Sequence, residues 1–420
     1  MRTRLPVLTR PRRLPLSACL AAMLGLAFST AEAVPFQGGM HRPNHRRAVV
    51  PSATLPFQKI AAVLQPGGPS PGNPASGTLH HVTSCDDDPN DPGTLRNIVS
   101  SPSTVSGDSI DFVQLPIMCS STITLSQGQA IEVFQDTLYL EGPGAAALTI
   151  DGNDSSSVLY HLGAGTLYVS GLTIAHGQYV GSNNPAGGCI RSASHVFLRD
   201  SIVSHCVATS SDANVFAAGG GVYTGGNLTL VRSTISSSHA FSQAAAYTFG
   251  GGAFVRGDFF SHYSSISGDS ASGTGHTRGG GLALLGSVAD IEGSTISENA
   301  AEIFGGLVAG AGTGTFILNS TISGNVAWLE FAGATTYGTL ILDNSTIAFN
   351  RSISGPSVNR LSVGGAALTL QSSIVADNAG PLGSSDLGGL SGANNLVVSS
   401  TLPLPVGGIF ASNFDGFCDF

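Results

Sequence analysis

The chain has 420 residues, of which 42% are hydrophobic and only 10% are charged, together with 56 glycines. That length and apolar content can fill a large core, which excludes disorder of the acidic, solvating kind. The small number of charges argues against a helix bundle, the formal net charge of −9 disfavours a nucleic-acid partner, and the composition favours short strands joined by glycine turns.

Residues 1–33 have the features of a secretory signal peptide. An arginine-rich start precedes the apolar stretch LPLSACLAAMLGLAF (14–28), and the A-x-A cleavage site AEA (31–33) follows it. We therefore expect an exported chain whose mature part has no transmembrane span. Residues 34–78 are rich in Pro, Gly and Ser, which predicts a flexible, disordered leader without a core of its own.

Residues 79–158 are expected to form an N-terminal cap and the first strands. The segment GTLRNIV predicts a short amphipathic helix over 93–99. Alternation of apolar and polar residues predicts strands in GDSIDF (107–112), STITL (121–125), DTLYLEG (136–142) and ALTIDG (147–152).

Five cysteines follow the signal peptide, and export permits disulfides between them. We expect Cys85 to pair with Cys119, because both lie in the non-repeating region. Cys189 and Cys206 form the second candidate pair, which leaves Cys418 over.

From residue 159 to residue 380 the sequence repeats itself. The phrase NSTISGN (319–325) returns at intervals of 25 to 32 residues, for example as RSTISSS (232–238) and GSTISEN (293–299), and a glycine cluster precedes most copies. Each period holds about three short alternating runs and almost no helix signal. This pattern predicts an all-β parallel β-helix, in which each strand pairs with its equivalent one coil further on. Residues 381–420 are expected to be a C-terminal tail.

The phrase itself predicts a structural unit. Its fourth position, Ile322 and equivalents, is expected to point inward and stack along the rod, while the neighbouring Ser and Thr point outward. Its seventh position carries an amide or a carboxyl in five coils, where a side chain at a turn can tolerate unusual backbone angles and bond to nearby amides. We expect these five residues to stack as a ladder: Asp269, Asn299, Asn325, Asn350 and Asn378.

These glycine clusters and phrases resemble the repeats of bacterial right-handed β-helix proteins with a pectin-lyase-like fold, and within that group the polymorphic outer-membrane-protein type. GGCI (187–190) loosely matches the GGAI-like motif of that type, and FILN (316–319) matches its FxxN motif once. The stretch SCDDDPNDPGTLRNIVSS (84–101), with LEGPGAAALTIDG (140–152) after it, is similar to the opening of such surface proteins. The resemblance implies a right-handed helix, a cap formed by the LR segment, and a place at the cell surface.

Three groups of side chains are candidate sites. Asp86, Asp87, Asp88 and Asp91 offer hard oxygen ligands for Ca²⁺, and the alternative is a solvated Pro/Asp turn. His80 and His81 near Cys85 are a candidate metal cluster, and the alternative is that these residues have a purely structural role. His176, His205, Glu298 and Asp377 share the sixth position of the phrase, where they either line a groove or mark a variable exposed position.

No recognised catalytic motif is present in the sequence, and the single tryptophan counts against an extended saccharide cleft. The sequence therefore favours a monomeric, non-catalytic surface protein that binds or displays, with no cofactor and with a glycan or another surface as partner. Its expected location is extracellular or on the outer membrane, with the periplasm as the other possibility. The alternative function is a polysaccharide lyase or glycoside hydrolase with an atypical carboxylate site, which requires two acidic side chains that converge in one groove.

Overall fold

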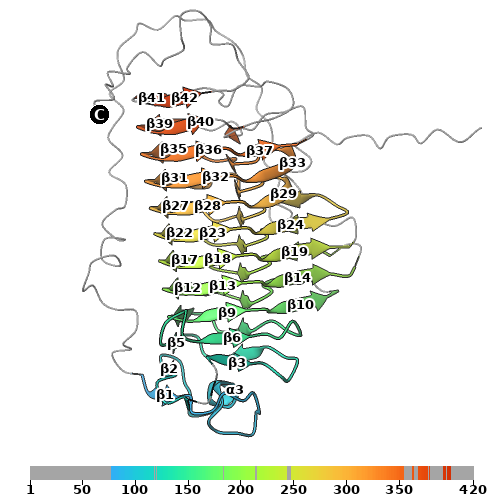
Figure 1. The fold of residues 1–420 in the computed structure, drawn as a ribbon, viewed down its shortest axis with the longest axis vertical. Helices are drawn as coiled ribbons and strands as arrows, with labels where there is room; N and C mark the ends of the chain where they lie inside the picture. The colour runs from blue at the N-terminus through green and yellow to red at the C-terminus, as the bar shows by residue number, and fades with distance from the viewer. Residues whose placement is uncertain are drawn as a thin grey trace, which may run out of the picture. The chain divides into compact units, whose positions relative to one another are not determined.

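The computed structural model describes residues 77–398, apart from residues 118, 120, 183, 213–214, 244–246, 354–361, 364–367, 377, 379–390 and 394. These residues form a parallel β-solenoid, in which the chain winds coil upon coil (Figure 1). Each coil pairs with the next in register, so that Ile296 lies opposite Ile322. The solenoid expected from the repeats is confirmed. The expected signal peptide, Cys418 and most of the expected leader and tail lie outside the described residues.

Two long sheets run along the solenoid, with 12 and 11 strands among the described residues. Sheet A contains β1 (Leu79–His81), β2 (Ser109–Asp111), β5 (Leu138–Glu141), β8 (Thr166–Ser170), β12 (His195–Arg199), β17 (Leu228–Val231), β22 (Phe259–His262), β27 (Val288–Glu292), β31 (Gly314–Leu318), β35 (Leu340–Asp343), β39 (Leu368–Gln371) and β41 (Ser391–Ala393). Sheet B contains β3 (Thr122–Thr124), β6 (Thr149–Asp151), β9 (Thr173–Ala175), β13 (Ile202–Ser204), β18 (Thr234–Ser236), β23 (Ser265–Ser267), β28 (Thr295–Ser297), β32 (Thr321–Ser323), β36 (Thr346–Ala348), β40 (Ile374–Ala376) and β42 (Leu396–Val398). Their last strands continue the coils beyond residue 380.

Two further sheets complete the coils. Sheet C contains β4 (Ile131–Val133), β7 (Leu159–His161), β11 (Ile190–Ser192), β16 (Val222–Thr224), β21 (Ala253–Val255), β26 (Leu282–Leu284), β30 (Leu307–Ala309), β34 (Ala334–Thr336) and β38 (Ser362–Val363). Sheet D contains β10 (Gln178–Gly181), β14 (Val207–Ser210), β15 (Ala217–Ala218), β19 (His239–Ser242), β20 (Thr248–Phe249), β24 (Ser270–Gly273), β25 (Thr277–Arg278), β29 (Ala300–Ile303), β33 (Val326–Glu330) and β37 (Arg351–Ser352).

Sheet D forms an arm beside the coils, which Figure 1 shows on the right. Four coils send the chain outward along β10, β14, β19 and β24, and β15, β20 and β25 bring it back toward sheet C. In the next coil, β29 pairs with both β24 and β25, so the excursion closes there. The interval between phrases shortens at the same point, from 30 residues between Ile266 and Ile296 to 26 between Ile296 and Ile322. The longer periods of the sequence therefore correspond to the coils that carry the excursion into the arm.

The repeated phrase forms the strands of sheet B together with the corners on both sides. Its first position has a positive φ in all eight copies, as at Asn319 (φ 50°), and its sixth position has one in all seven described copies, as at Glu298 (φ 59°). The seventh position, whose amide side chains can tolerate unusual backbone angles, does not adopt them, because none of its described non-glycine residues has a positive φ. The unusual conformation is instead adopted one residue earlier, where the chain turns out of the sheet.

A serine ladder lies at the second position of the phrase, two residues before the inward isoleucine. Ser294 is buried, its backbone N–H donates to Ser320 Oγ at 3.0 Å, and its own Oγ accepts from the N–H of Ser264 at 3.1 Å. Equivalent bonds join each described neighbour from Ser201 to Ser373. Strand alternation places positions two and four on the same, inner face, while positions three and five, for which outward side chains were expected, are only partly buried at Thr321 and Ser323.

The predicted ladder at the seventh position is present. Asn325 is fully buried, and its Nδ2 donates to Ile296 O at 3.0 Å and to Asn350 Oδ1 at 2.8 Å. Its Oδ1 accepts from the backbone N–H and the Nδ2 of Asn299, both at 3.0 Å. Asn350 and Asn378 repeat the pattern, and Asp269 joins it through its backbone N–H. Buried polar side chains are thus satisfied from coil to coil.

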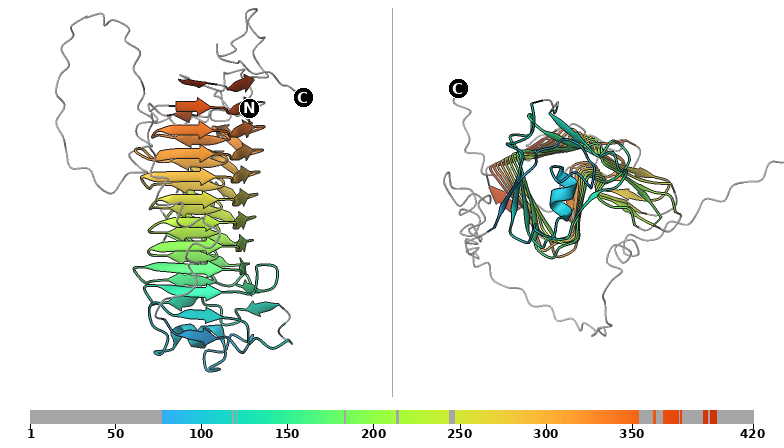
Figure 2. Two further views of the ribbon diagram at one scale, coloured as in Figure 1. Left: turned by 90° about the vertical axis from the view of Figure 1, so that its left-hand side faces the viewer. Right: turned by 90° about the horizontal axis from the view of Figure 1, so that it is seen from below.

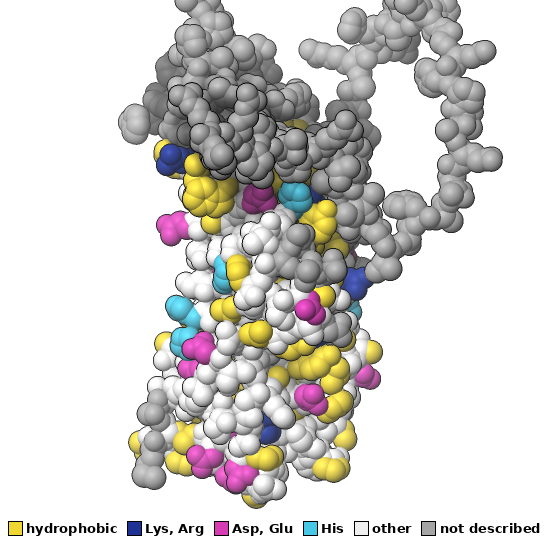
Figure 3. Space-filling model, turned by 90° about the vertical axis from the view of Figure 1, so that its right-hand side faces the viewer, with side chains coloured by type: hydrophobic (Ala, Val, Ile, Leu, Met, Phe, Trp, Pro, Cys, Tyr) yellow, Lys and Arg dark blue, Asp and Glu magenta, His cyan; other side chains and the backbone are white. Residues whose placement is uncertain are grey.

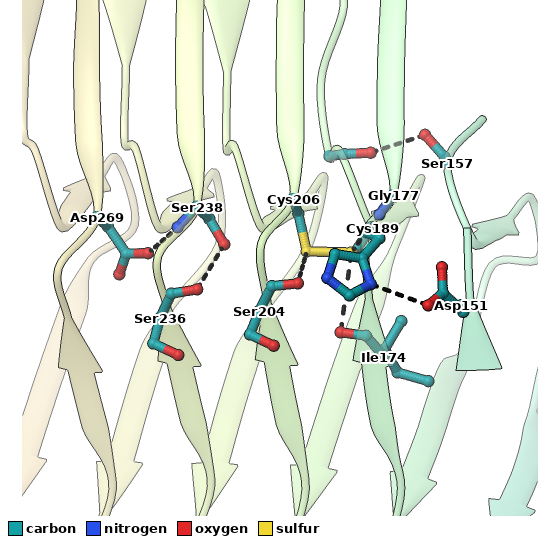
Figure 4. The surroundings of a disulfide bond; sticks show 12 residues. Asp151, Ser157, Ile174, Gly177, Cys189, Ser204, Cys206, Ser236, Ser238 and Asp269 are labelled. Carbon is teal, nitrogen blue, oxygen red and sulfur yellow. Dashed lines mark hydrogen bonds and ion pairs between the residues drawn. A yellow bond between two sulfur atoms is a disulfide. The ribbon is translucent and has the colours of Figure 1, made fainter. Parts of the chain in front are cut away.

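Both candidate cysteine pairs lie at disulfide distance, with Cα separations of 5.6 Å for Cys85–Cys119 and 5.3 Å for Cys189–Cys206. Figure 4 shows that Cys206 belongs to the same row as Ser238 and Asp269. In the later coils the residue equivalent to Cys189 is glycine, and a Cβ on Gly281 would approach Asn299 Nδ2 to 2.8 Å. The disulfide therefore occupies a place where later coils have a glycine against a ladder side chain.

The N-terminal end of the core is closed by α3 (Leu95–Ser100), which confirms the predicted helix. Viewed from that end, the helix lies within the cross-section of the coils (Figure 2). Thr94 caps the helix by accepting from Asn97 N–H at 3.2 Å, while Leu95, Ile98 and Val99 are buried. No described helix is long and apolar enough to cross a membrane.

Candidate ligand-binding notch

A cavity of about 630 Å³ lies where the first excursion of the arm meets sheet C and the N-terminal cap. We call it the notch. The preceding coil runs from β6 to β7 without an arm strand, so β10 is an edge strand of sheet D within the described residues. Gln178, Tyr179 and Val180 of β10 form one wall, and Glu132 of β4 and Tyr160 of β7 lie on the sheet C side. The start of the arm thus creates the concavity.

Arg191 lines the notch next to two aromatic rings. Its guanidinium carbon lies 4.9 Å from the ring centroid of Tyr160 and 5.5 Å from that of Tyr179. Parallel pairing of β7 with β11 places Arg191 beside Tyr160, and Tyr179 reaches the same guanidinium from β10. Cation–π contacts with two rings hold the side chain in position. The planar donors of Arg191 are thereby fixed against an aromatic wall.

The two arginines of the notch differ in what they can offer a ligand. Arg96 is bound on several sides, because it donates to both carboxylate oxygens of Asp87 and to the carbonyls of Gln129 and Ala130. Arg191 has no carboxylate partner among the described residues. Its guanidinium donors are therefore available to an acceptor in the notch.

The rim of the notch is apolar. Phe134 is 66% exposed and Val180 is 56% exposed, and both line the cavity. The face of the molecule shown in Figure 3 carries few charged side chains, which are spread in small groups among apolar and small polar ones. A concave site with aromatic walls, an apolar rim and a few fixed polar groups is the usual form of a small-ligand site.

Three of the four aspartates predicted as a calcium site have side-chain partners in the structure, and Asp86 takes part through its backbone N–H, which donates to Ser84 Oγ at 3.4 Å. Asp87 pairs with Arg96, Asp88 Oδ1 accepts from the N–H of Asn90 at 2.9 Å, and Asp91 Oδ1 accepts from the N–H of Gly93 at 2.9 Å. Across the described part of the chain, no three His, Cys, Asp or Glu side chains are placed to hold a metal ion. Calcium binding stays a prediction, and these hydrogen bonds match the turn alternative.

The two neighbouring histidines also have carboxylate partners. His80 Nε2 lies 3.0 Å from Asp108 Oδ2, and His81 Nδ1 lies 2.7 Å from Asp111 Oδ1. Cys85, the third member of the proposed metal cluster, is joined to Cys119. These contacts favour the structural reading of this group.

The sixth-position row forms a corner between sheet B and the arm. The rings of His176 and His205 lie 5.4 Å apart, and His176 Nδ1 contacts Asp151 Oδ2 at 2.9 Å. Neither histidine nor Glu298 lines the notch, and Asp377 lies outside the described residues. The positive φ shared by the described members shows that their position is set by the corner.

A second candidate group of side chains, which the sequence did not reveal, lies on the outer face of sheet A. His262 is 2% exposed, and its Nδ1 lies 3.5 Å from Glu292 Oε2. Asp290, two residues before Glu292 on β27, has a buried Oδ1 without a hydrogen-bond partner. Burial raises the pKa of Asp290, the charge of His262 lowers it, and the Glu292 carboxylate raises it again. No motif marks this group, because its members are brought together only by the pairing of β22 with β27.

The fold defines a parallel β-solenoid with a cavity at its side. Comparison of the chain with protein-family models, with curated proteins and with solved structures found no match. The class of the protein therefore rests on the solenoid itself.

Proposed function

We propose that the chain is an exported, surface-exposed β-solenoid that binds a saccharide in the notch. The observation that supports this function best is Arg191 held between Tyr160 and Tyr179 at the wall of a cavity. Aromatic rings match the apolar faces of sugar rings, while the arginine, Gln178 and Glu132 offer donors and acceptors for hydroxyl groups. The rest of the solenoid serves as a rigid scaffold that presents the notch at one end.

A cell-surface role agrees with the other features of the chain. The resemblance to polymorphic outer-membrane-protein repeats and the proposed signal peptide both suggest export to the surface. Two cysteine pairs at disulfide distance are compatible with an oxidising compartment. We further propose that the protein acts as a monomer and as an adhesin or envelope component toward a glycan-bearing partner.

Replacing Tyr160 with alanine should weaken saccharide binding about tenfold or more, because the variant loses the stacking wall and the support of Arg191. The measurement is titration of the mature chain from residue 34 against a panel of neutral and acidic oligosaccharides. Tyr263→Ala is the matched control, since Tyr263 is an exposed ring away from the notch, and its affinity should stay unchanged. If both variants bind like the parent chain, the notch is not the binding site.

The outer face of sheet A favours a second candidate function, the cleavage of a glycosidic bond. Asp290 with its raised pKa is suited to protonate the leaving oxygen, and Glu292 is suited to accept a proton from the attacking water. His262 lies against Glu292 and orients this carboxylate. Its two acidic side chains are neighbours on one face of sheet A and do not line the notch, so the expected convergence of two acidic side chains in one groove is not met there.

If this second candidate is correct, Asp290→Asn abolishes the release of reducing ends from a polysaccharide substrate, because the amide cannot donate a proton to the leaving group. Asp343→Asn, on the same face of sheet A, should retain full activity. Absence of turnover by the parent chain on a broad polysaccharide panel would leave saccharide binding in the notch as the function of the chain.

A further inference from the structure

Asp269 is the only carboxyl in the seventh-position ladder, where it lies between Ser238 and Asn299. The side chain is 1% exposed. Its Oδ1 accepts a hydrogen bond from Ser238 N–H at 2.8 Å, and its backbone N–H donates to Asn299 Oδ1 at 3.0 Å. Its Oδ2 is buried and has no hydrogen-bond partner. The next residue, Ser270, begins β24, so Asp269 lies at the root of the last excursion of the arm.

The amide coils show what the second side-chain atom normally does at this position. Asn299 Nδ2 donates to Ile266 O, one coil earlier, at 3.1 Å and to Asn325 Oδ1, one coil later, at 3.0 Å. The equivalent neighbours of Asp269 are Ile235 O and Asn299 Oδ1. Both of these atoms are acceptors, so an ionised carboxylate would set oxygen against oxygen, whereas a protonated carboxyl supplies one donor.

We propose that Asp269 is a proton-operated latch at the root of the arm. When the carboxyl is protonated, Oδ2–H donates in place of the amide and the ladder stays closed from coil to coil. When the carboxyl loses its proton, the donor disappears and a buried charge is created. The ladder then opens between the coils of Ser238 and Asn299, and the arm loosens at β24.

The surroundings of the latch supply no compensating charge. Ser238 faces it from the coil before, Asn299 from the coil after, and Gly252 from the glycine cluster of the same coil, where a Cβ would approach Oδ2 to 2.6 Å. None of these groups titrates. Burial raises the pKa of Asp269 well above its ordinary value of 3.8, and the hydrogen bond from Ser238 lowers it only in part.

The direction of the pH effect follows from this raised pKa. In the unfolded chain Asp269 releases its proton near its ordinary pKa of 3.8, whereas in the folded chain it holds the proton to higher pH. The folded state therefore binds more protons between the two pKa values, and its stability falls as pH rises there. The contribution of the latch is complete below pH 3.8 and is lost as pH rises through the folded pKa.

The test compares the mature chain with Asp269→Asn by urea unfolding at a series of pH values, together with hydrogen exchange of the Ser238 amide. The unfolding midpoints should differ least at the acid end and separate steadily as pH rises, with the parent chain the less stable. Exchange at Ser238, corrected for the intrinsic pH dependence, should accelerate in the parent chain by about tenfold for each 1.4 kcal/mol of lost local stability.

Two further variants make the test decisive. Asp343→Asn removes a carboxyl from the outer face of sheet A, and its midpoint curve should run parallel to that of the parent chain. Asp269→Ser introduces the residue that the ladder already has at Ser238, so it replaces Asp269→Asn if the latter does not fold. If the Asp269 variant keeps the full pH dependence of the parent chain, so that their midpoint curves run parallel, the latch is overturned.

Discussion

Replacing Arg96 with methionine should lower the free energy of unfolding by about 3–5 kcal/mol, because Asp87 is then left as a buried charge without a charged partner, held only by the N–H of Gln127. The Asp87 side chain is 1% exposed, and Arg96 Nε donates to its Oδ1 at 2.6 Å. The same guanidinium also fixes the carbonyls of Gln129 and Ala130, which belong to the chain just before β4. Its loss therefore detaches the cap from the first coils.

The measurement is chemical denaturation of the mature chain, and the chain offers a matched control. Arg232 bonds Asp200 with the same two-point geometry, but the two side chains are 54% and 47% exposed. Arg232→Met should therefore change stability by only about 0–1 kcal/mol. The double replacement of Arg96 by Met and Asp87 by Leu should recover part of the loss, since no unpaired charge remains. Equal effects at Arg96 and Arg232 would show that the cap does not depend on the buried pair.

Replacing Asn325 with leucine should cost a similar amount, about 3–5 kcal/mol, since several buried partners lose their hydrogen bonds at once. The N–H of Asn299 loses its acceptor, Asn299 Nδ2 loses one of two acceptors, and Ile296 O loses its donor. Leucine has nearly the same shape, so the change isolates the hydrogen bonds from the packing of the core. Unfolding should also become less cooperative, because the coils on either side are coupled through this ladder.

Thr321→Val is the control for the ladder prediction, since Thr321 lies in the same coil but is only partly buried, at the third position of the phrase. Its effect on the denaturation midpoint should stay within about 0.5 kcal/mol. Hydrogen exchange of the amides of Asn299 and Val326 would locate the damage. If Asn325→Leu is as stable as Thr321→Val, the ladder is a consequence of the stacking of the coils and does not stabilise that stacking.

Strand alternation in the sequence also indicates which side chains of the repeated phrase face the core. Ser320 and Ile322 differ by two positions, so a strand must place both on one face. The inner position of the Ser320 side chain is favourable because its Oγ accepts from Ser294 N–H and donates to Ile291 O, both in the previous coil. A polar residue can lie in such a core because a neighbouring coil adds hydrogen-bond partners to those of its own coil.

The sequence by itself determined the period, the parallel solenoid, the capping helix, the two cysteine pairs and the ladder from Asp269 to Asn378. All of these depend on residues that recur at fixed spacing or lie close along the chain, so that local chemistry and repetition predict them. Only the tertiary structure decided the rest: the pairing of Asp87 with Arg96, the arm, the notch around Arg191 and the approach of His262 to Glu292. The physical reason is register, because the neighbours of each of these side chains are set by which coil lies above it and where the chain leaves the sheet.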